Sequence, residues 1–262
     1  LYEGLVSSGQ NAFPSVNFDL AAINGLLLSP FFAAGFYYKT FIGLPPFEWG
    51  KGTKIWMMYE KLIRRAAGMG VASKLPDSDK YEHANDFCDV MVIGSGPAGI
   101  AAAQEAADKK LDVILVEQDS IIGGDKLSDK NFESENLKLS LINSGVRIMN
   151  RTTAFGLYDN CVAGLLERVT DHTHNKFEYL PRQRFWTIRS KHIILTTGAF
   201  ERHIAFNNND LPGVMNANAA KHYLNRYGII TGKNITLATN NDSVYNTAIE
   251  LSKAGSRVTV ID

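Results

Sequence analysis

Short apolar runs alternate with stretches of helical spacing over much of this chain. The run Cys88–Ile93 is too short for a helix and suits a buried parallel strand. Ile100–Ala107 opens a helix, and Asp112–Val116 is a second short apolar run. The order of strand, helix and strand predicts a βαβ unit, and therefore an α/β fold.

A glycine-rich turn, Gly94–Gly99, joins the first strand to the helix with the spacing GxGxxG. In a Rossmann unit the first glycine permits the tight turn, the second lets the backbone approach a pyrophosphate, and the third lets the helix pack on the sheet. The free N–H groups and the positive dipole end of the helix then face the phosphates. We therefore predict that a dinucleotide contacts Gly94, Ser95, Gly96, Pro97, Ala98 and Gly99.

Glu117 ends the second strand roughly twenty residues beyond the glycines, where a Rossmann unit places its ribose-binding carboxylate. A carboxylate here can accept hydrogen bonds from both ribose hydroxyls, and its charge would repel a 2′-phosphate. We therefore expect NAD or FAD rather than NADP. The glycine pair Gly123–Gly124 follows, and it either lets its loop pass close to the ribose and pyrophosphate or forms a plain turn.

Alternating polar and apolar residues predict antiparallel strands further along the chain. They cover Thr152–Tyr158, Val162–Thr170 and Arg184–Arg189, after a helix at Asn131–Asn143 and a strand at Val146–Met149. We interpret the three as a β-meander inserted in the Rossmann domain.

Two further positions are expected near the nucleotide. The backbone at Ala154 should lie near the adenine, because the third parallel strand ends there. The strand Lys191–Thr197 closes on Gly198, which indicates another close approach of backbone to ligand.

A second βαβ pattern follows, with strand, helix and strand at 235–238, 243–254 and 257–261. Alignment of the strands puts Thr239, Asn241 and Val244 where the first unit has its glycines. Asparagine tolerates a left-handed backbone, but these side chains would crowd a pyrophosphate. We expect no nucleotide here, and we assign Asp242 and Asn240 as turn and N-cap residues of the helix.

The N-terminal part shows no such order. Leu20–Tyr38 is almost uncharged and nearly long enough to span a membrane, but Pro30 would break a helix there. We expect this segment to be buried under the nucleotide domain or against another subunit rather than in a membrane. Ile55–Ala67 has the spacing of an amphipathic helix, and Lys74–Asp86 is predicted to be a linker or surface loop.

Composition excludes several functions. Lysine plus arginine equal aspartate plus glutamate at 27 each, so there is no basic field for nucleic acid or acidic lipid. Cys88 and Cys161 are far apart and form no CxxC, which argues against a redox-active disulfide, a zinc site and a secreted disulfide framework. No histidine stands in a catalytic or metal-binding pattern, so we predict neither a catalytic residue nor a metal ligand. The start, Leu1–Gly4, lacks an initiator methionine and the basic start of a signal peptide, so we expect a piece of a longer, cytoplasmic protein.

Together these patterns predict three regions. Residues 1–86 form an N-terminal extension, residues 87–230 a dinucleotide-binding Rossmann domain with the inserted meander, and residues 231–262 the first βαβ unit of a second Rossmann-like domain.

Longer motifs resemble the alpha subunits of heterotetrameric sarcosine oxidases, which are related to flavoproteins with two dinucleotide-binding domains. The resemblance covers nearly the whole chain, including the unusual second turn. It is carried by Ala34–Phe41, Leu62–Gly68, Thr152–Gly156, Glu167–His172, Pro181–Arg184, Tyr223–Gly228 and Asn240–Ser243.

The resemblance implies an oxidoreductase subunit that acts on CH–NH donors. In that family sarcosine is oxidised at a flavin held by the beta subunit and at its interface, the alpha subunit carries an NAD, and a folate region lies in its C-terminal half. The implied partners are the flavin-bearing beta subunit and smaller subunits, and the piece alone is expected to be inactive. The resemblance implies NAD contacts at Gly94, Gly96, Ala98, Gly99, Glu117, Gln118, Asp119, Asp125 and Ala154.

Two positions depart from that family. Asp125 follows Gly124 where a small or hydroxyl residue is expected, and Gln118 stands where relatives tend to carry a second acid. The ribose contact would then rest on Glu117 alone. Two alternatives stay open: a self-sufficient FAD-dependent NAD(P)H oxidoreductase of the thioredoxin-reductase-like class, and a non-catalytic interaction subunit whose nucleotide staples the fold.

Overall fold

The computed structural model describes residues 14–15, 18–20, 75–77, 79–129, 132–173, 179–209, 211 and 213–262. Contacts divide the chain into Leu1–Ser78 and Asp79–Asp262. In the first unit β1 (Pro14–Ser15) pairs antiparallel with β2 (Phe18–Asp19). The apolar segment Leu20–Tyr38, apart from Leu20, and the expected helix Ile55–Ala67 lie outside the described residues. The division of the chain at residues 87 and 231 stays a prediction.

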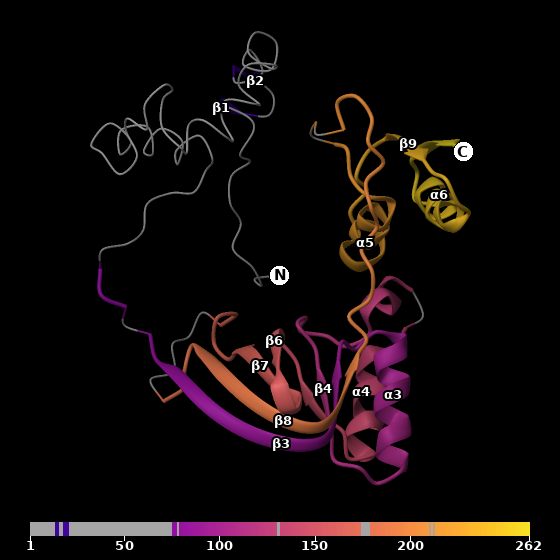
Figure 1. The fold of residues 1–262 in the computed structure, drawn as a ribbon. Helices are drawn as coiled ribbons and strands as arrows, with labels where there is room; N and C mark the ends of the chain where they lie inside the picture. Colours follow the sequence, from indigo (N-terminus) through magenta and orange to yellow (C-terminus); the bar gives the residue numbers. More distant parts are fainter. Residues whose placement is uncertain are drawn as a thin grey trace, which may run out of the picture. The chain divides into compact units, whose positions relative to one another are not determined.

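A six-stranded mixed sheet organises the second unit (Figure 1), with the order β5-β4-β3-β8-β7-β6. The parallel strands are β3 (Tyr81–Ile93), β4 (Val113–Val116), β5 (Arg147–Met149) and β8 (Gln183–Leu195). The antiparallel strands are β6 (Thr152–Tyr158) and β7 (Val162–Arg168), joined by the short 3-10 helix η2 (Asp159–Cys161). The predicted α/β class with an antiparallel meander is confirmed.

The core lies on both faces of this sheet, because successive strand side chains point to opposite sides. On one face Val92 and Leu115 pack with α3 (Pro97–Asp108) and α4 (Ser134–Asn143). On the other, Met91 and Ile114 join Leu165 of the meander. Burial of both faces explains the unbroken apolar runs of β3 and β4.

One prediction is wrong at β8, the strand that joins the meander to the parallel part of the sheet. The sequence predicts separate strands at Arg184–Arg189 and Lys191–Thr197, but β8 is continuous through both. Its first half pairs antiparallel with β7, and nearly its whole length pairs parallel with β3. Ser190, between the two predicted strands, is not a turn-forming glycine or proline and is buried within the strand.

A second prediction is wrong at the start of β3. Tyr81–Asp86, expected in a loop, forms the first half of this strand and pairs with Gln183–Ile188 of β8. Arg184 bonds to Glu82 across the two strands at 2.7 Å. Most of these β3 residues are exposed, so no apolar alternation marks them, and only the distant partner strand makes them extended.

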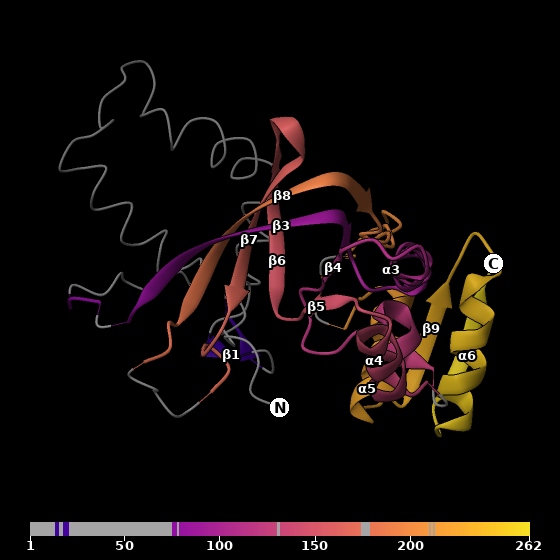
Figure 2. The same cartoon turned by 90° about the horizontal axis from the view of Figure 1, so that it is seen from below.

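The chain then leaves the sheet and forms the second βαβ unit. Helix α5 (Ala217–Tyr227) contacts both α6 (Ser243–Lys253) and the short 3-10 helix η1 (Gly124–Ser128). Strands β9 (Asn234–Ala238) and β10 (Arg257–Ile261) pair parallel as a separate sheet beside α6 (Figure 2). The predicted strand–helix–strand order is confirmed. Across the described ranges, we find no helix whose length and hydropathy would allow it to cross a bilayer.

Candidate dinucleotide site

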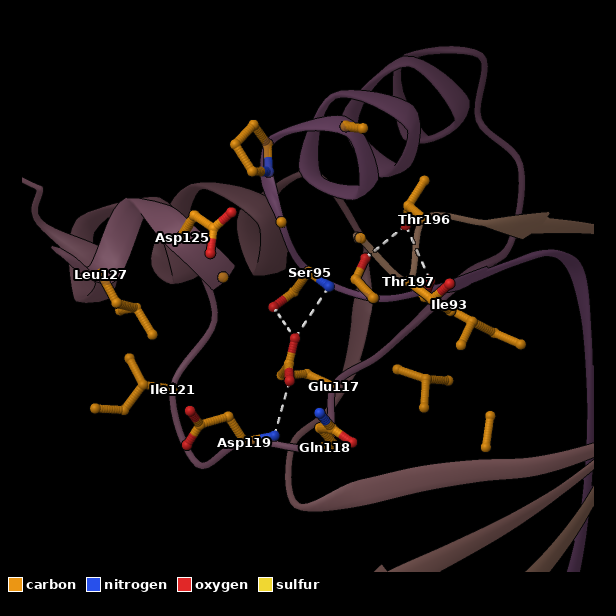
Figure 3. A pocket seen from close by; sticks show the side chains of 18 of the residues that line it. Ile93, Ser95, Glu117, Gln118, Asp119, Ile121, Asp125, Leu127, Thr196 and Thr197 are labelled. Atoms are coloured by element: carbon orange, nitrogen blue, oxygen red, sulfur yellow. Dashed lines mark hydrogen bonds between the residues drawn. The ribbon is translucent and has the colours of Figure 1, made fainter. Parts of the chain in front are cut away.

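A cavity of about 620 Å³ opens where the parallel strands β3, β4 and β8 end, and it gathers the predicted residues (Figure 3). The carboxyl ends of parallel strands are where open α/β sheets bind ligands. Of the predicted site residues, only Gly99 does not line the cavity. The structure brings together Gly94, Ser95, Gly96, Pro97, Ala98, Glu117, Gln118, Asp119, Gly124, Asp125, Ala154 and Gly198.

The three glycines of the first turn have different surroundings. A Cβ on Gly94 would lie 2.3 Å from the carbonyl oxygen of Thr196, and the φ of Gly94 is +103°. A Cβ on Gly99 would lie 1.9 Å from the carbonyl oxygen of Gly94, so this glycine lets α3 pack against the turn. A Cβ on Gly96 would meet no protein atom within 4 Å. Packing within the protein therefore does not require a glycine at position 96. The missing side chain instead leaves open space in the cavity.

The start of α3 is suited to an anion. No side chain caps the helix at Gly96, and its first turn contains no acidic residue. The first N–H groups of a helix have no intrahelical acceptor and lie at the positive end of its dipole. The open space at Gly96 and this bare helix start fit the pyrophosphate of a dinucleotide.

Glu117 is held by three donors of the chain. Its Oε2 accepts hydrogen bonds from the Ser95 backbone N–H at 3.0 Å and the Ser95 hydroxyl at 2.5 Å. Its Oε1 accepts one from the Asp119 N–H at 2.8 Å. Because each carboxylate oxygen has two lone pairs, Oε1 can take one ribose hydroxyl in this conformation. A second ribose hydroxyl would have to displace Ser95.

Helix α5 supplies a wall of the cavity that sequence reasoning missed. Arg226 lines the cavity and pairs with Asp119, with Nη1 2.6 Å from Oδ2. Burial raises the pKa of Asp119, but the hydrogen bonds from Arg226 and Ser120 outweigh it and hold that pKa below its usual value. Asp119 is therefore charged at neutral pH and neutralises the guanidinium.

His222 also lines the cavity, one helical turn before Arg226 on α5. Its Nδ1 lies 3.2 Å from the Ser128 hydroxyl, and its Nε2 lies 3.5 Å from Asp125 Oδ1. Polar residues four apart on a helix share a face, and this spacing is the sequence signal for His222 and Arg226. That signal does not say what the face contacts, so both residues were missed.

The second turn is closed on itself. The Thr239 hydroxyl donates to the Asn241 carbonyl oxygen at 2.7 Å, and the Asn241 N–H donates back to that hydroxyl at 3.1 Å. Asn241 Oδ1 accepts a hydrogen bond at 3.0 Å from the N–H of Ser243, the first residue of α6. Asp242 precedes the helix as predicted, but its side chain makes no capping hydrogen bond. The Asn241 side chain thus accepts the first N–H of α6, a donor that a phosphate at this helix start would need.

Neither cysteine is in a disulfide. Cys88 is buried in β3 and Cys161 is exposed in η2. Burial, with a smaller contribution from the nearby Asp112, raises the pKa of the Cys88 thiol to about 11. These two thiols therefore provide no redox-active pair near the cavity.

The chain is similar to a known protein family and to solved structures of oxidoreductases. Residues 88–262 match the family of pyridine nucleotide-disulphide oxidoreductases. Among solved structures the chain is similar to L-proline dehydrogenase from P. horikoshii, with a TM-score of 0.55 and 25% identity over 70% of this chain and 37% of that chain.

Curated relatives extend the similarity beyond the matched family region. Sarcosine oxidase subunit alpha of Rhizobium meliloti (strain 1021) is 45% identical over 100% of this chain and 26% of the relative. The subunit of the same name from Corynebacterium sp. (strain U-96) is 36% identical over 75% of this chain and 22% of the relative. The chain thus spans about a quarter of the length of these relatives. It belongs to the pyridine nucleotide-disulphide oxidoreductase family, and it is homologous to the alpha subunits of sarcosine oxidases.

Proposed function

We propose that this chain is the NAD-binding part of the alpha subunit of a sarcosine-oxidase-like complex. The observation that carries the proposal is the cavity at Gly96, where a bare helix start lies beside the buried carboxylate of Glu117. The pyrophosphate would lie against Gly96 and the first turn of α3, and the adenosine ribose against Glu117. The negative charge of Glu117 favours NAD over NADP.

The proposed reaction of the whole complex is the oxidative demethylation of sarcosine in the cytoplasm. The names of the relatives support a CH–NH donor, because sarcosine and L-proline are both secondary amines beside a carboxylate. The proposed partners are a flavin-bearing beta subunit and smaller subunits, with a folate site outside these residues. A nicotinamide or flavin would supply hydride-transfer chemistry when bound, and Gly96, the first turn of α3 and Glu117 would hold its phosphates and ribose.

An FAD in the same cavity is the second candidate, because the pyrophosphate and ribose contacts are common to both dinucleotides. A self-sufficient thioredoxin-reductase-like enzyme is disfavoured by two observations. The turn at Asn241 is closed by its own hydrogen bonds, and Cys88 and Cys161 are not paired. The third candidate is a non-catalytic interaction subunit whose nucleotide only stabilises the fold. It differs from our proposal because no partner subunit would then supply the oxidation chemistry.

Mass spectrometry of the small molecule released on denaturation tests the cofactor. NAD from a colourless protein supports the proposal, whereas FAD from a yellow protein supports the second candidate. Co-purification with a flavin-bearing subunit, together with sarcosine-dependent oxygen uptake by that complex, tests the role in the complex. A complex that forms without amine-dependent oxygen uptake would support the staple instead.

A further inference from the structure

At the ribose end of the cavity, two carboxylates and a guanidinium are linked by hydrogen bonds. The Asp119 N–H donates to Glu117 Oε1, and Asp119 Oδ2 lies 2.6 Å from Arg226 Nη1. All three residues line the cavity. The guanidinium of Arg226 is therefore separated by one residue from the carboxylate at the expected ribose position.

Acidic residues and arginines at this position of a dinucleotide site favour different nucleotides. An acid at the end of the second strand bonds the ribose hydroxyls of NAD, whereas a nearby arginine accommodates the 2′-phosphate of NADP. The guanidinium fork matches phosphate geometry and carries a fixed positive charge. In this cavity Arg226 supplies such a guanidinium, but it forms an ion pair with the Asp119 carboxylate.

We propose that the pair of Asp119 and Arg226 determines which dinucleotide this cavity accepts. By neutralising Arg226, Asp119 keeps the cavity selective for a ribose with a free 2′-hydroxyl. Loss of the Asp119 charge turns the guanidinium into a 2′-phosphate receptor. This inference rests on the proposed function, because it needs a dinucleotide with its adenosine ribose at Glu117.

The position of Arg226 does not depend on Asp119 alone. On the same helix, Asn225 donates a hydrogen bond to Glu250 of α6, and His222 contacts Ser128 of η1. The side chains of Arg226 and Asp119 are 23% and 29% exposed, so solvent only partly screens their interaction. Asp119→Asn should therefore remove the charge and leave α5 in place.

The test is a calorimetric titration of the nucleotide-free full chain with NAD and with NADP. The variants are Asp119→Asn, Arg226→Met and the double variant, and Asp159→Asn in the turn between β6 and β7 is the matched control. The wild type and the control should prefer NAD. We expect Asp119→Asn to raise the affinity for NADP relative to NAD by roughly ten- to hundredfold, the range of a charged hydrogen bond. The double variant should lose this gain.

The outcomes separate the inference from the proposed function. Failure of the wild type to bind NAD would contradict both. NAD binding with an unchanged ratio in Asp119→Asn would overturn the inference and leave the proposed function standing. A gain that persists in the double variant would also overturn it, because simple removal of negative charge would then explain the effect.

Discussion

Ser95 donates both its backbone N–H and its hydroxyl to the same oxygen of Glu117. The Ser95 hydroxyl also accepts a hydrogen bond from the Gly123 N–H at 3.2 Å. One small residue thus ties together the glycine turn, the end of β4 and the loop before η1. These are the three segments that form the proposed phosphate and ribose site.

Ser95→Ala should loosen this junction. The variant keeps the backbone bond but leaves the buried Glu117 with one donor fewer, which costs about 1–3 kcal/mol of the free energy of unfolding. Nucleotide affinity should fall with it. Thermal unfolding and titration with NAD measure the two effects. Ser252→Ala, on the exposed side of α6, is the matched control and should change neither.

Two glycines of the same turn should respond differently to alanine. Gly99→Ala places a Cβ against the Gly94 carbonyl, so α3 must move, and we expect a loss of about 1–3 kcal/mol or more in stability. Gly96→Ala points into open space at an extended backbone conformation, so we expect a smaller loss, about 1 kcal/mol or less, from the poorer N-cap alone. Its nucleotide affinity should nevertheless fall. Equal destabilisation by both variants would show that Gly96 is a packing glycine.

Acid should weaken the contact between Asp119 and Arg226. The folded-state pKa of Asp119 lies below the ordinary value of 3.8, so its charge adds stability above that pH. The contribution is lost as the pH falls through the depressed folded-state pKa. Wild type should therefore be more stable than Arg226→Met at neutral pH, with the difference shrinking below pH 3.8. A difference that does not change with pH would mean that Arg226 acts by packing.

The two thiols should differ sharply in reactivity. Thiolates react with disulfide reagents and thiols do not, so the buried Cys88 with its raised pKa should be inert in the folded chain. The exposed Cys161 should react readily. Colorimetric thiol counting before and after denaturation measures both. Labelling of folded Cys161→Ser would show that β3 opens.

The sequence predicted the elements that depend on local patterns better than those that depend on contacts between distant residues. The βαβ units follow from periodicity and the glycine turn, both of which are encoded within a few residues. Tyr81–Asp86 lacks an apolar alternation, and its strand depends on pairing with residues a hundred positions away. Arg226 and His222 reach the cavity only because α5 packs against η1, and that contact leaves no mark in the spacing of α5 itself.

The central claim is that the nucleotide binds at the first turn, at Gly96, and not at the second turn, at Asn241. The most direct test compares Gly96→Val with Asn241→Ala. Asn241→Ala removes a hydrogen bond to the first N–H of α6 and should cost about 1 kcal/mol of stability without loss of nucleotide. Each protein is purified in its folded state and then denatured to release bound nucleotide. Mass spectrometry should detect stoichiometric NAD from the wild type and from Asn241→Ala, and none from Gly96→Val. Retention of NAD by Gly96→Val, together with its loss from Asn241→Ala, would contradict the account.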